Sequence, residues 1–462
     1  MIIREILVRM ERGAPTCMML RAMLENVFAA DRLDQLFVET ARLQENKTLL
    51  FSTVAEIMGL VALRIRPSVH AAFQARKEEV AVTAKALYDK LQRMEPRISQ
   101  AVVRHTAAGL RPILEAMKQA RQTVLPGYQV KILDGNHLRR TERRIEELRT
   151  LNAAPLPGHC LVVLDPQWKL VTDVFPCEDG HAQERSLLGV VAETVQPRDV
   201  WIDDRNFCTT KFLGGIHRRQ AFFIVRQHAN SLITGEAGPR KRIGRGPTGV
   251  IYEQSLRMWD ENFDCVNIRR ITIVLDQPTR DGDTELHILT NLPKRIGAKR
   301  IAELYRSRWS IETAFWEIAE NLEGEIETLG YPRAALFSFC MALAGFNLIS
   351  VIRTALQIAH AQDDNPPPIS FYYICDEISH TYRGLELVMN AEDGEREFSS
   401  LTPQQLAQRL LKIATHADLS QYRKHPRGPK KPPPKMNKKK RNHVSTAKIL
   451  KEKRNYKIMN LC

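Results

Sequence analysis

Two aspartates stand directly after short apolar runs that predict buried strands. Asp134 ends a predicted strand at residues 129–133, and Asp204 follows the apolar residues 200–202. If the two strands are neighbours in a sheet, the carboxylates approach each other and their repulsion raises one pKa. A divalent cation removes that penalty, and oxygen ligands suit Mg²⁺ or Mn²⁺, which also bind phosphates. The pair therefore predicts a metal site, although a single Asp at a strand end is also an ordinary turn former or helix cap.

Two other aspartates compete for the same role. Asp165 precedes a proline after a predicted strand, which is ordinary turn chemistry. Asp203 adjoins Asp204 in the chain and points to the opposite face if the strand is regular. Spacing alone leaves open which of Asp203 and Asp204 faces a metal.

A third acid lies on a predicted helix that begins at residue 298 and continues past residue 320. In the run YRSRWSIE, Tyr305, Arg308 and Glu312 share one helix face, since successive residues turn by about 100°. An adjoining apolar stripe would pack on a sheet, so Glu312 could be held rigidly and still reach a metal. Arg308 could offer its planar guanidinium to a phosphate. An exposed Arg–Glu pair one turn apart is the plainer interpretation of the same spacing.

The elements that would position these residues alternate between strand and helix. Strands are predicted at 129–133, 161–164, 170–175, 200–202 and 221–225, and helices at 182–194 and 209–217. Three strands, helix, strand, helix, strand is the order of a ribonuclease-H-like α/β fold, a mixed sheet flanked by helices. In that fold the first and fourth strands are neighbours, which would bring Asp134 toward Asp204.

Composition shifts divide the chain into six segments. We expect a helical N-terminal domain at 1–125, in which residues 68–104 form either a DNA-binding module or a simple helical cap. The two parts of the catalytic core lie at 126–227 and 294–352. Between them, residues 228–293 form a β-rich insertion, with a basic Gly-rich loop at 238–246 and strands at 249–254, 271–275 and 285–289. A helical C-terminal region at 353–420 and a basic tail at 421–462 complete the chain.

One apolar run, at residues 334–352, is long enough to be mistaken for a membrane span. Ser338, Asn347 and Ser350 interrupt it, so we interpret it as a buried core helix and expect no membrane association. Eight scattered cysteines include no C-x-x-C pair, which disfavours a zinc site or disulfides and fits a reducing cytoplasm.

The net charge of +15 is concentrated in the tail. Residues 421–457 hold fifteen Lys or Arg and one acid, so the rest of the chain is nearly neutral. Prolines among these lysines predict a disordered segment that contacts the DNA backbone without sequence preference. A solvated, solubilising extension is the alternative.

Taken together, the motifs resemble those of insertion-sequence transposases of the DDE class, the branch with a Y-x2-R-x3-E-x6-K signature. Tyr305, Arg308 and Glu312 match the first three signature positions, and the resemblance extends over roughly residues 126–352. Residues 133–135 (LDG), 204–207 (DRNF), 287–293 (HILTNLP) and 301–309 (IAELYRSRW) are also similar to that family. The DRNF motif favours Asp204 over Asp203. The sequence departs from the signature at position 319, where Ala319 replaces the lysine and removes one expected phosphate contact.

The resemblance implies a ribonuclease-H-like transposase whose catalytic and metal-binding triad is Asp134, Asp204 and Glu312. Two Mg²⁺ or Mn²⁺ ions, about 3.5–4 Å apart and bridged by Asp134, would activate a water and stabilise the leaving 3′ oxygen. The freed 3′-OH would then attack target DNA. Tyr305, Arg308 and Arg205 are implied to contact DNA.

The same resemblance implies the partners: double-stranded transposon ends and target DNA, bound by a dimer on the nucleoid in a bacterial cytoplasm. A catalytically inactive DNA-binding remnant and a ribonuclease-H-like nuclease, which would hydrolyse but not join, are the alternatives.

Overall fold

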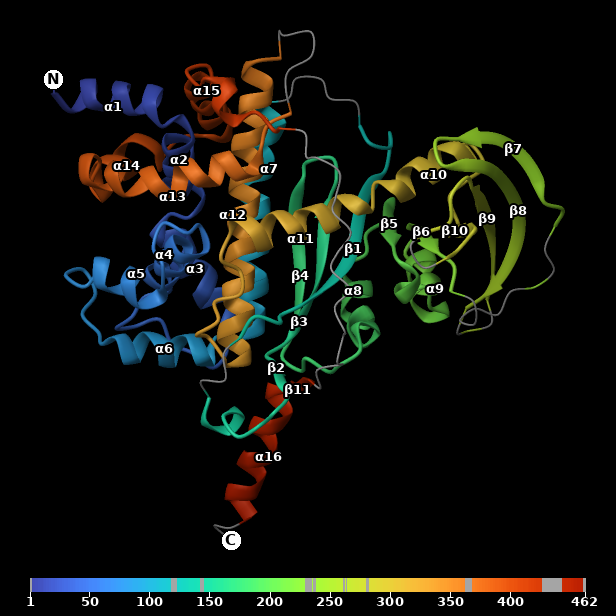
Figure 1. The fold of residues 1–462 in the computed structure, drawn as a ribbon, viewed down its shortest axis with the longest axis horizontal. Coiled ribbons are helices and arrows are strands. Elements are labelled where there is room, and N and C mark those ends of the chain that lie inside the picture. The colour runs from blue at the N-terminus through green and yellow to red at the C-terminus, as the bar shows by residue number, and fades with distance from the viewer. Residues whose placement is uncertain are drawn as a thin grey trace.

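The computed structural model describes residues 2–117, 123–141, 145–228, 235, 238–260, 262, 264–279, 282–361, 368–425 and 443–459. Within these residues the chain is a mixed α/β protein with one large mixed sheet and many helices (Figure 1). A helical body lies on one side of the sheet in this view, and the strands β7 to β10 lie at the other end.

The first half of the sheet is built from strands that the sequence predicted in the same order. They are β1 (Gln129–His137), β3 (His159–Asp165), β4 (Leu170–Cys177), β5 (Asp199–Asp203) and β6 (Phe222–Arg226). Their spatial order is β4-β3-β1-β5-β6. Strand β3 is antiparallel to both β1 and β4, whereas β5 is parallel to both β1 and β6. Strand β1 therefore lies beside β5, so the segments that carry Asp134 and Asp204 are neighbours.

Strand β1 is longer than expected and changes the setting of Asp134. The apolar pattern predicted an end at residue 133, but the strand continues to His137. Residues 134–137 remain extended because they pair with residues 162–159 of β3. Asp134 thus lies inside a strand and not at its end.

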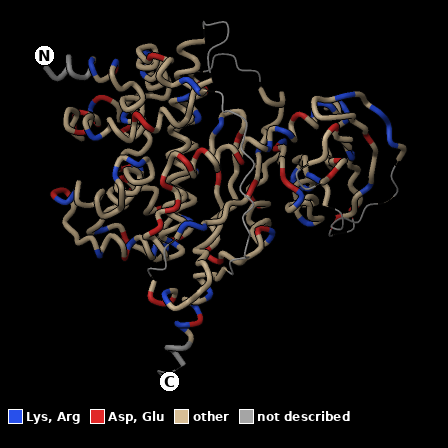
Figure 2. The backbone as a smooth tube through the Cα atoms, in the orientation of Figure 1, with Lys and Arg blue, Asp and Glu red and all other residues tan. Residues whose placement is uncertain are grey.

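The segment at 228–293 extends the same sheet. Strands β7 (Lys241–Gly246), β8 (Gly249–Trp259), β9 (Cys265–Leu275) and β10 (Glu285–Thr290) form consecutive antiparallel pairs, and β10 pairs with β6. Among the described residues this makes a sheet of nine strands. The edge strand β7 carries the basic loop residues, and Figure 2 shows this run of Lys and Arg at the outer margin of the molecule. Charged side chains at such an edge discourage pairing with another chain.

Two apolar layers cover the faces of the sheet. On one face, Ile132 and Ile202 join a core built largely from α7 (Pro96–Met117), α10 (Ala298–Arg306), α11 (Trp309–Asn321) and α12 (Pro332–Ala359). On the other face, Leu133 and Trp201 pack with α8 (Leu188–Glu193) and α9 (Thr210–Arg218). Because side chains alternate along a strand, neighbouring residues of β1 and β5 belong to different layers.

The N-terminal and C-terminal helices form one body around α12. The N-terminal set is α1 (Ile2–Gly13), α2 (Pro15–Val27), α3 (Ala30–Thr40), α4 (Phe51–Ala62), α5 (Val69–Ala75) and α6 (Ala84–Arg93). The C-terminal set is α13 (Phe371–Val388), α14 (Ala391–Phe398) and α15 (Pro403–Ala414). Helix α12 contacts α2, α4, α6, α7, α13 and α15. The predicted module at 68–104 contributes Leu87, Leu91 and Val102 to this common core.

Helix α12 is the apolar run that resembles a membrane span in composition. It is long and apolar enough to cross a bilayer, but its most apolar stretch is entirely buried inside the fold. Its Asn347 is buried as well and bonds both backbone groups of Val171, donating to the carbonyl (2.8 Å) and accepting from the amide (2.7 Å). Asn347 therefore supplies hydrogen-bond partners to the backbone of the outer strand β4. This agrees with the expectation of a buried core helix.

The expectation of a disordered tail is wrong for residues 421–425, where Tyr422 is buried and Arg423 pairs with Ile369, and for residues 443–459. Strand β11 (His443–Ser445) pairs in parallel with β2 (Ala154–Leu156), and α16 (Thr446–Met459) follows. Two ion pairs join this helix to the rest of the fold, Lys448 with Asp179 (3.3 Å) and Lys453 with Glu147 (3.2 Å). These long-range partners order a segment whose composition alone predicted disorder, whereas residues 426–442 of the tail lie outside the described residues.

Candidate active site

The alternation of side chains places Asp134 and Asp204 on one face of the sheet. Asp134 has the same parity as Ile132, and Asp204 the same as Ile202, so both face the layer that contains α11. Asp204 follows the last residue of β5 and keeps an extended backbone, so the alternation holds to this position. Asp203 has the parity of Trp201 and belongs to the opposite face. Backbone geometry thus separates the two neighbouring acids, which sequence spacing had left open.

The helical segment that carries the third acid is divided in two. The sequence predicted one helix from residue 298 past residue 320, but α10 ends at Arg306 and α11 begins at Trp309. Around the break the amides of Arg308, Ser310 and Ile311 bond the carbonyls three residues earlier, which is the tighter 3₁₀ pattern. The Ser307 hydroxyl also donates to the Leu304 carbonyl at 2.6 Å. The break leaves Arg308 at the N-cap position and Glu312 in the first turn of α11.

Arg308 joins two of the predicted triad residues directly. Its Nη1 donates to Asp134 Oδ2 at 3.2 Å, and its Nη2 donates to Glu312 Oε1 at 2.7 Å. The side chain of Arg308 is 11% exposed, against 53% for Glu312. The guanidinium is therefore largely buried between a sheet acid and a helix acid.

Asp134 and Asp204 interact through their charges. The pKa of Asp134 is raised to about 6 from its ordinary value of 3.8, mainly by burial, and the negative charges of Asp204 and Glu312 act in the same direction. The Gly135 amide, which donates to Asp134 Oδ1 at 2.9 Å, and the Arg308 cation oppose this shift. The charges of Asp204 and Glu312 therefore both act on Asp134 in the interior of β1, with Arg308 as the compensating cation.

Asp203 has a different environment from Asp204. It is fully buried, and neither of its carboxylate oxygens has a hydrogen-bond partner within the described part of the chain. Burial first, and then the negative charge of Asp134, raise its pKa well above the ordinary value. Burial therefore favours the protonated form of Asp203.

The remaining predicted site residues lie at the margin of this cluster. Tyr305 is half-buried in α10, and burial together with the charge of Asp204 raises its pKa to about 12, while Arg308 acts against this shift. Arg205 is exposed in the short 3₁₀ helix η3 (Arg205–Phe207). Its charge helps lower the pKa of Asp283, after the larger effect of the hydrogen bonds from Arg226 and Thr279. Tyr305 thus belongs to the acid cluster, and Arg205 lies beside it in the chain.

Glu184 is a residue near the site that the sequence analysis did not select. It accepts from the Asn206 side chain at 2.5 Å, two residues after Asp204. Its carboxylate also lies against Gly135, where an added Cβ would be 2.0 Å from Glu184 Oε1. Glu184 therefore links the segments that follow Asp134 and Asp204. No local signal marks it, since it stands in a short 3₁₀ turn, η2 (Glu184–Leu187), far along the chain from Asp134.

The donor set suits a hard divalent cation, although the present arrangement does not group the ligands tightly. Among the described residues, no three His, Cys, Asp or Glu side chains are close enough together to hold a metal ion. Arg308 contacts two of the three carboxylates and supplies positive charge in this arrangement. For Asp134, Asp204 and Glu312 to bind one ion, Arg308 must release at least one of them. The oxygen-only chemistry fits Mg²⁺ or Mn²⁺.

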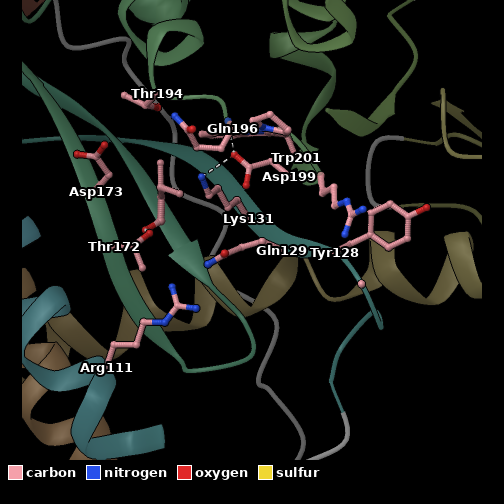
Figure 3. Close-up of a pocket in the computed structure, with 14 residues that line it drawn as sticks. Arg111, Tyr128, Gln129, Lys131, Thr172, Asp173, Thr194, Gln196, Asp199 and Trp201 are labelled. Carbon is pink, nitrogen blue, oxygen red and sulfur yellow. Dashed lines mark hydrogen bonds and ion pairs between the residues drawn. The ribbon is translucent and has the colours of Figure 1, made fainter. Parts of the chain in front are cut away.

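A separate cleft of about 600 Å³ lies at the other end of β1 and β5 (Figure 3). Lys131, Asp199 and Trp201 line it, and the Lys131 ammonium lies 2.6 Å from Asp199 and 5.1 Å from the centre of the Trp201 ring. The residues described around this cleft include none of the predicted site residues. The cleft and the acid cluster are therefore distinct features of the sheet.

Residues 126–325 match the family model described as a transposase DDE domain. These residues include the three acids, Tyr305 and Arg308. The match supports a DDE transposase. It leaves open the branch with the Y-x2-R-x3-E-x6-K signature.

One relative and one solved structure are also similar to this chain. The protein "Putative transposase y4zB" of Sinorhizobium fredii (strain NBRC 101917 / NGR234) is 29% identical over 126 residues, which cover 27% of this chain and 34% of the relative. The chain thus matches about a third of that relative's length. A structure of the piggyBac transposase synaptic complex with hairpin DNA covers 86% of this chain and 84% of its own, at 9% identity. Its TM-score of 0.37 is too low to carry an argument about this fold.

Proposed function

We propose that this protein is a DNA transposase that cleaves the ends of an insertion sequence and joins the 3′-OH to target DNA. One observation carries the proposal. Arg308, a cation with a phosphate-binding geometry, lies between Asp134 of the sheet and Glu312 of α11, on the face toward which Asp204 also points. The family match over residues 126–325 supports the same activity.

The proposal includes a ribonuclease-H-like core of the Y-x2-R-x3-E-x6-K type. In its favour, the strand order β4-β3-β1-β5-β6 combines an antiparallel trio with two parallel additions. This arrangement puts β1 beside β5 and places α11 over the face of the sheet that these two strands share. Tyr305, Arg308 and Glu312 keep the spacing of that signature up to position 319.

In the proposed mechanism, Asp134, Asp204 and Glu312 hold Mg²⁺ or Mn²⁺. When bound, the metal supplies a nucleophile from water or a 3′-OH and stabilises the leaving oxygen of an in-line displacement. Arg308, released from at least one carboxylate, would contact the scissile phosphate with its planar guanidinium. Tyr305, next to Arg308, positions the same phosphate, and Arg205 contacts the DNA backbone.

The partners follow from the reaction. Two transposon ends must be brought together before joining, so we propose a dimer on double-stranded DNA. A bacterial cytoplasm is the proposed location.

The decisive experiment compares three candidate activities in one reaction. The purified full chain is incubated with Mg²⁺ and labelled duplexes from the DNA that flanks the gene, and products are separated on a denaturing gel. A transposase yields both nicked strands and strands joined to a second duplex. Nicks without joined strands would indicate a nuclease, and DNA binding without either product would indicate an inactive remnant.

A further inference from the structure

The chain lacks the lysine of the signature, but it places another cation at the same point of α11. We propose that Arg140 supplies the phosphate contact that Ala319 cannot make, so that the DNA end is bound by an arginine from the segment after β1. The inference rests on the proposed function, because it concerns how the same site binds DNA.

The position of Ala319 on α11 defines where the missing cation would act. Ala319 follows Glu312 by seven residues, which returns it to the same helix face about 10 Å further along the axis. The Ala319 side chain is half-buried, whereas Glu312 is exposed. Nη1 of Arg140 lies 3.5 Å from the Ala319 carbonyl oxygen. An exposed guanidinium therefore lies beside the backbone of the residue that occupies the lysine position of the signature.

Hydrogen bonds hold the backbone from Leu138 to Arg140 in place. Leu138 is buried, and its amide donates to the Gly158 carbonyl at 3.1 Å, which continues the β1–β3 pairing. The amides of Arg139 and Arg140 both donate to Glu325 Oε2, at 2.5 and 2.8 Å. Glu325 lies just beyond α11, so one carboxylate connects the segment that follows Asp134 to the helix that carries Glu312.

Capping of the helix C-terminus does not by itself account for Arg140. Arg64 already performs that role, because its guanidinium donates to the carbonyls of Glu320 (2.7 Å) and Leu322 (3.1 Å). The approach of Arg140 to Ala319 is longer, at the limit of a hydrogen bond. A planar guanidinium in this place can instead bind a phosphate with two parallel hydrogen bonds, which an ammonium cannot do.

The test measures DNA binding by the full chain in EDTA, so that no strand is cut. The probe is a fluorescein-labelled duplex from the DNA that flanks the gene, titrated at several KCl concentrations. Arg140→Ala should weaken binding about tenfold and reduce the slope of log affinity against log salt by about 1, as expected for one lost phosphate contact. Arg140→Lys should keep most of the slope.

Rescue provides the sharper evidence. Adding Ala319→Lys to Arg140→Ala should restore both the affinity and the slope, because it puts a cation back on the same helix face. Arg64→Ala is the matched control, since it should lower the melting temperature and leave the slope unchanged. An unchanged slope in a folded Arg140→Ala variant, or no rescue by Ala319→Lys, would overturn the inference.

The wild-type cleavage reaction separates this inference from the proposed function. If the wild-type chain cuts and joins DNA but Arg140→Ala leaves the slope of log affinity against log salt unchanged, only the inference about Arg140 fails. If it neither cuts nor joins, the proposed function fails, whatever the binding slope.

Discussion

The guanidinium of Arg308 lies 3.2 Å from the carboxylate of Asp134, although 174 positions separate the two residues in the chain. The contact joins the start of α11 to the interior of β1. It also places a positive charge where two further carboxylates, those of Asp204 and Glu312, act on Asp134.

The adjacent residues Asp203 and Asp204 should respond differently to the same isosteric change. Asp204→Asn should abolish strand cleavage, because it removes a carboxylate from the face that Asp134 shares. Asp203→Asn should retain cleavage within a few-fold, since Asp203 is fully buried and has the parity of Trp201 on the opposite face of the sheet. Gel assays of both variants, after a check of their melting temperatures, provide the comparison. Loss of cleavage in a stably folded Asp203→Asn variant would contradict the face assignment.

Asp134 should destabilise the metal-free protein as the pH rises. Its pKa is raised to about 6 in the folded chain from an ordinary value of 3.8, so the unfolded chain releases the proton first. The stability that the neutral carboxyl contributes is complete below about pH 4 and is lost as the pH rises through about 6.

The Asp134→Asn variant tests this sign. In EDTA at pH 8 it should exceed the wild-type free energy of unfolding by about 2 kcal/mol, and the gap should close near pH 4. Adding Mg²⁺ should raise the melting temperature of the wild type and have little effect on the variant. A variant that is less stable than the wild type in EDTA at pH 8 would show that the ionised Asp134 carboxylate does not destabilise the folded protein.

Asn347 should be essential to the packing of α12 on the sheet. Asn347→Leu leaves the buried amide and carbonyl of Val171 without partners, which should cost about 3 kcal/mol of stability. Ser338→Ala on the same helix is the control, because the buried Ser338 hydroxyl has no partner among the described residues. Denaturant unfolding should show a large shift for the first variant and almost none for the second. Equal shifts would mean that α12 is held by apolar contacts alone.

Local sequence patterns predicted the elements well where burial alone determines them. The apolar runs at 129–133, 200–202 and 221–225 mark strands whose side chains alternate between the two core layers. The long run at 334–352 is buried in α12. In each case the signal is a short apolar pattern that any packed sheet or core helix requires.

The features that sequence missed depend on partners far away in the chain. The extension of β1 through His137 follows from pairing with β3, and β11 forms because β2 lies beside it. The division between α10 and α11 carries no Gly or Pro, so only the 3₁₀ bonds around Arg308 reveal it. Glu184 likewise acquires its position from Gly135 and Asn206. The periodicity of apolar residues along the chain does not reveal contacts between segments that are far apart in the sequence.

The choice between Asp203 and Asp204 shows what local sequence patterns can decide and what they cannot. Spacing left the two residues equivalent, and only the DRNF resemblance favoured Asp204. Alternation along β5 then placed Asp204 on the face of Asp134 for an independent reason. The predicted triad itself stays a prediction until its chemistry is measured.

Strand cleavage by Glu312→Gln in Mg²⁺ tests the central claim most directly. Glu312 is 53% exposed, so the substitution should leave the fold and the binding of a flanking-DNA duplex intact. The wild type should release nicked and joined strands, and the variant should release neither, with a loss of at least about a hundredfold. A folded Glu312→Gln protein that still nicked the duplex at the wild-type rate would contradict the triad.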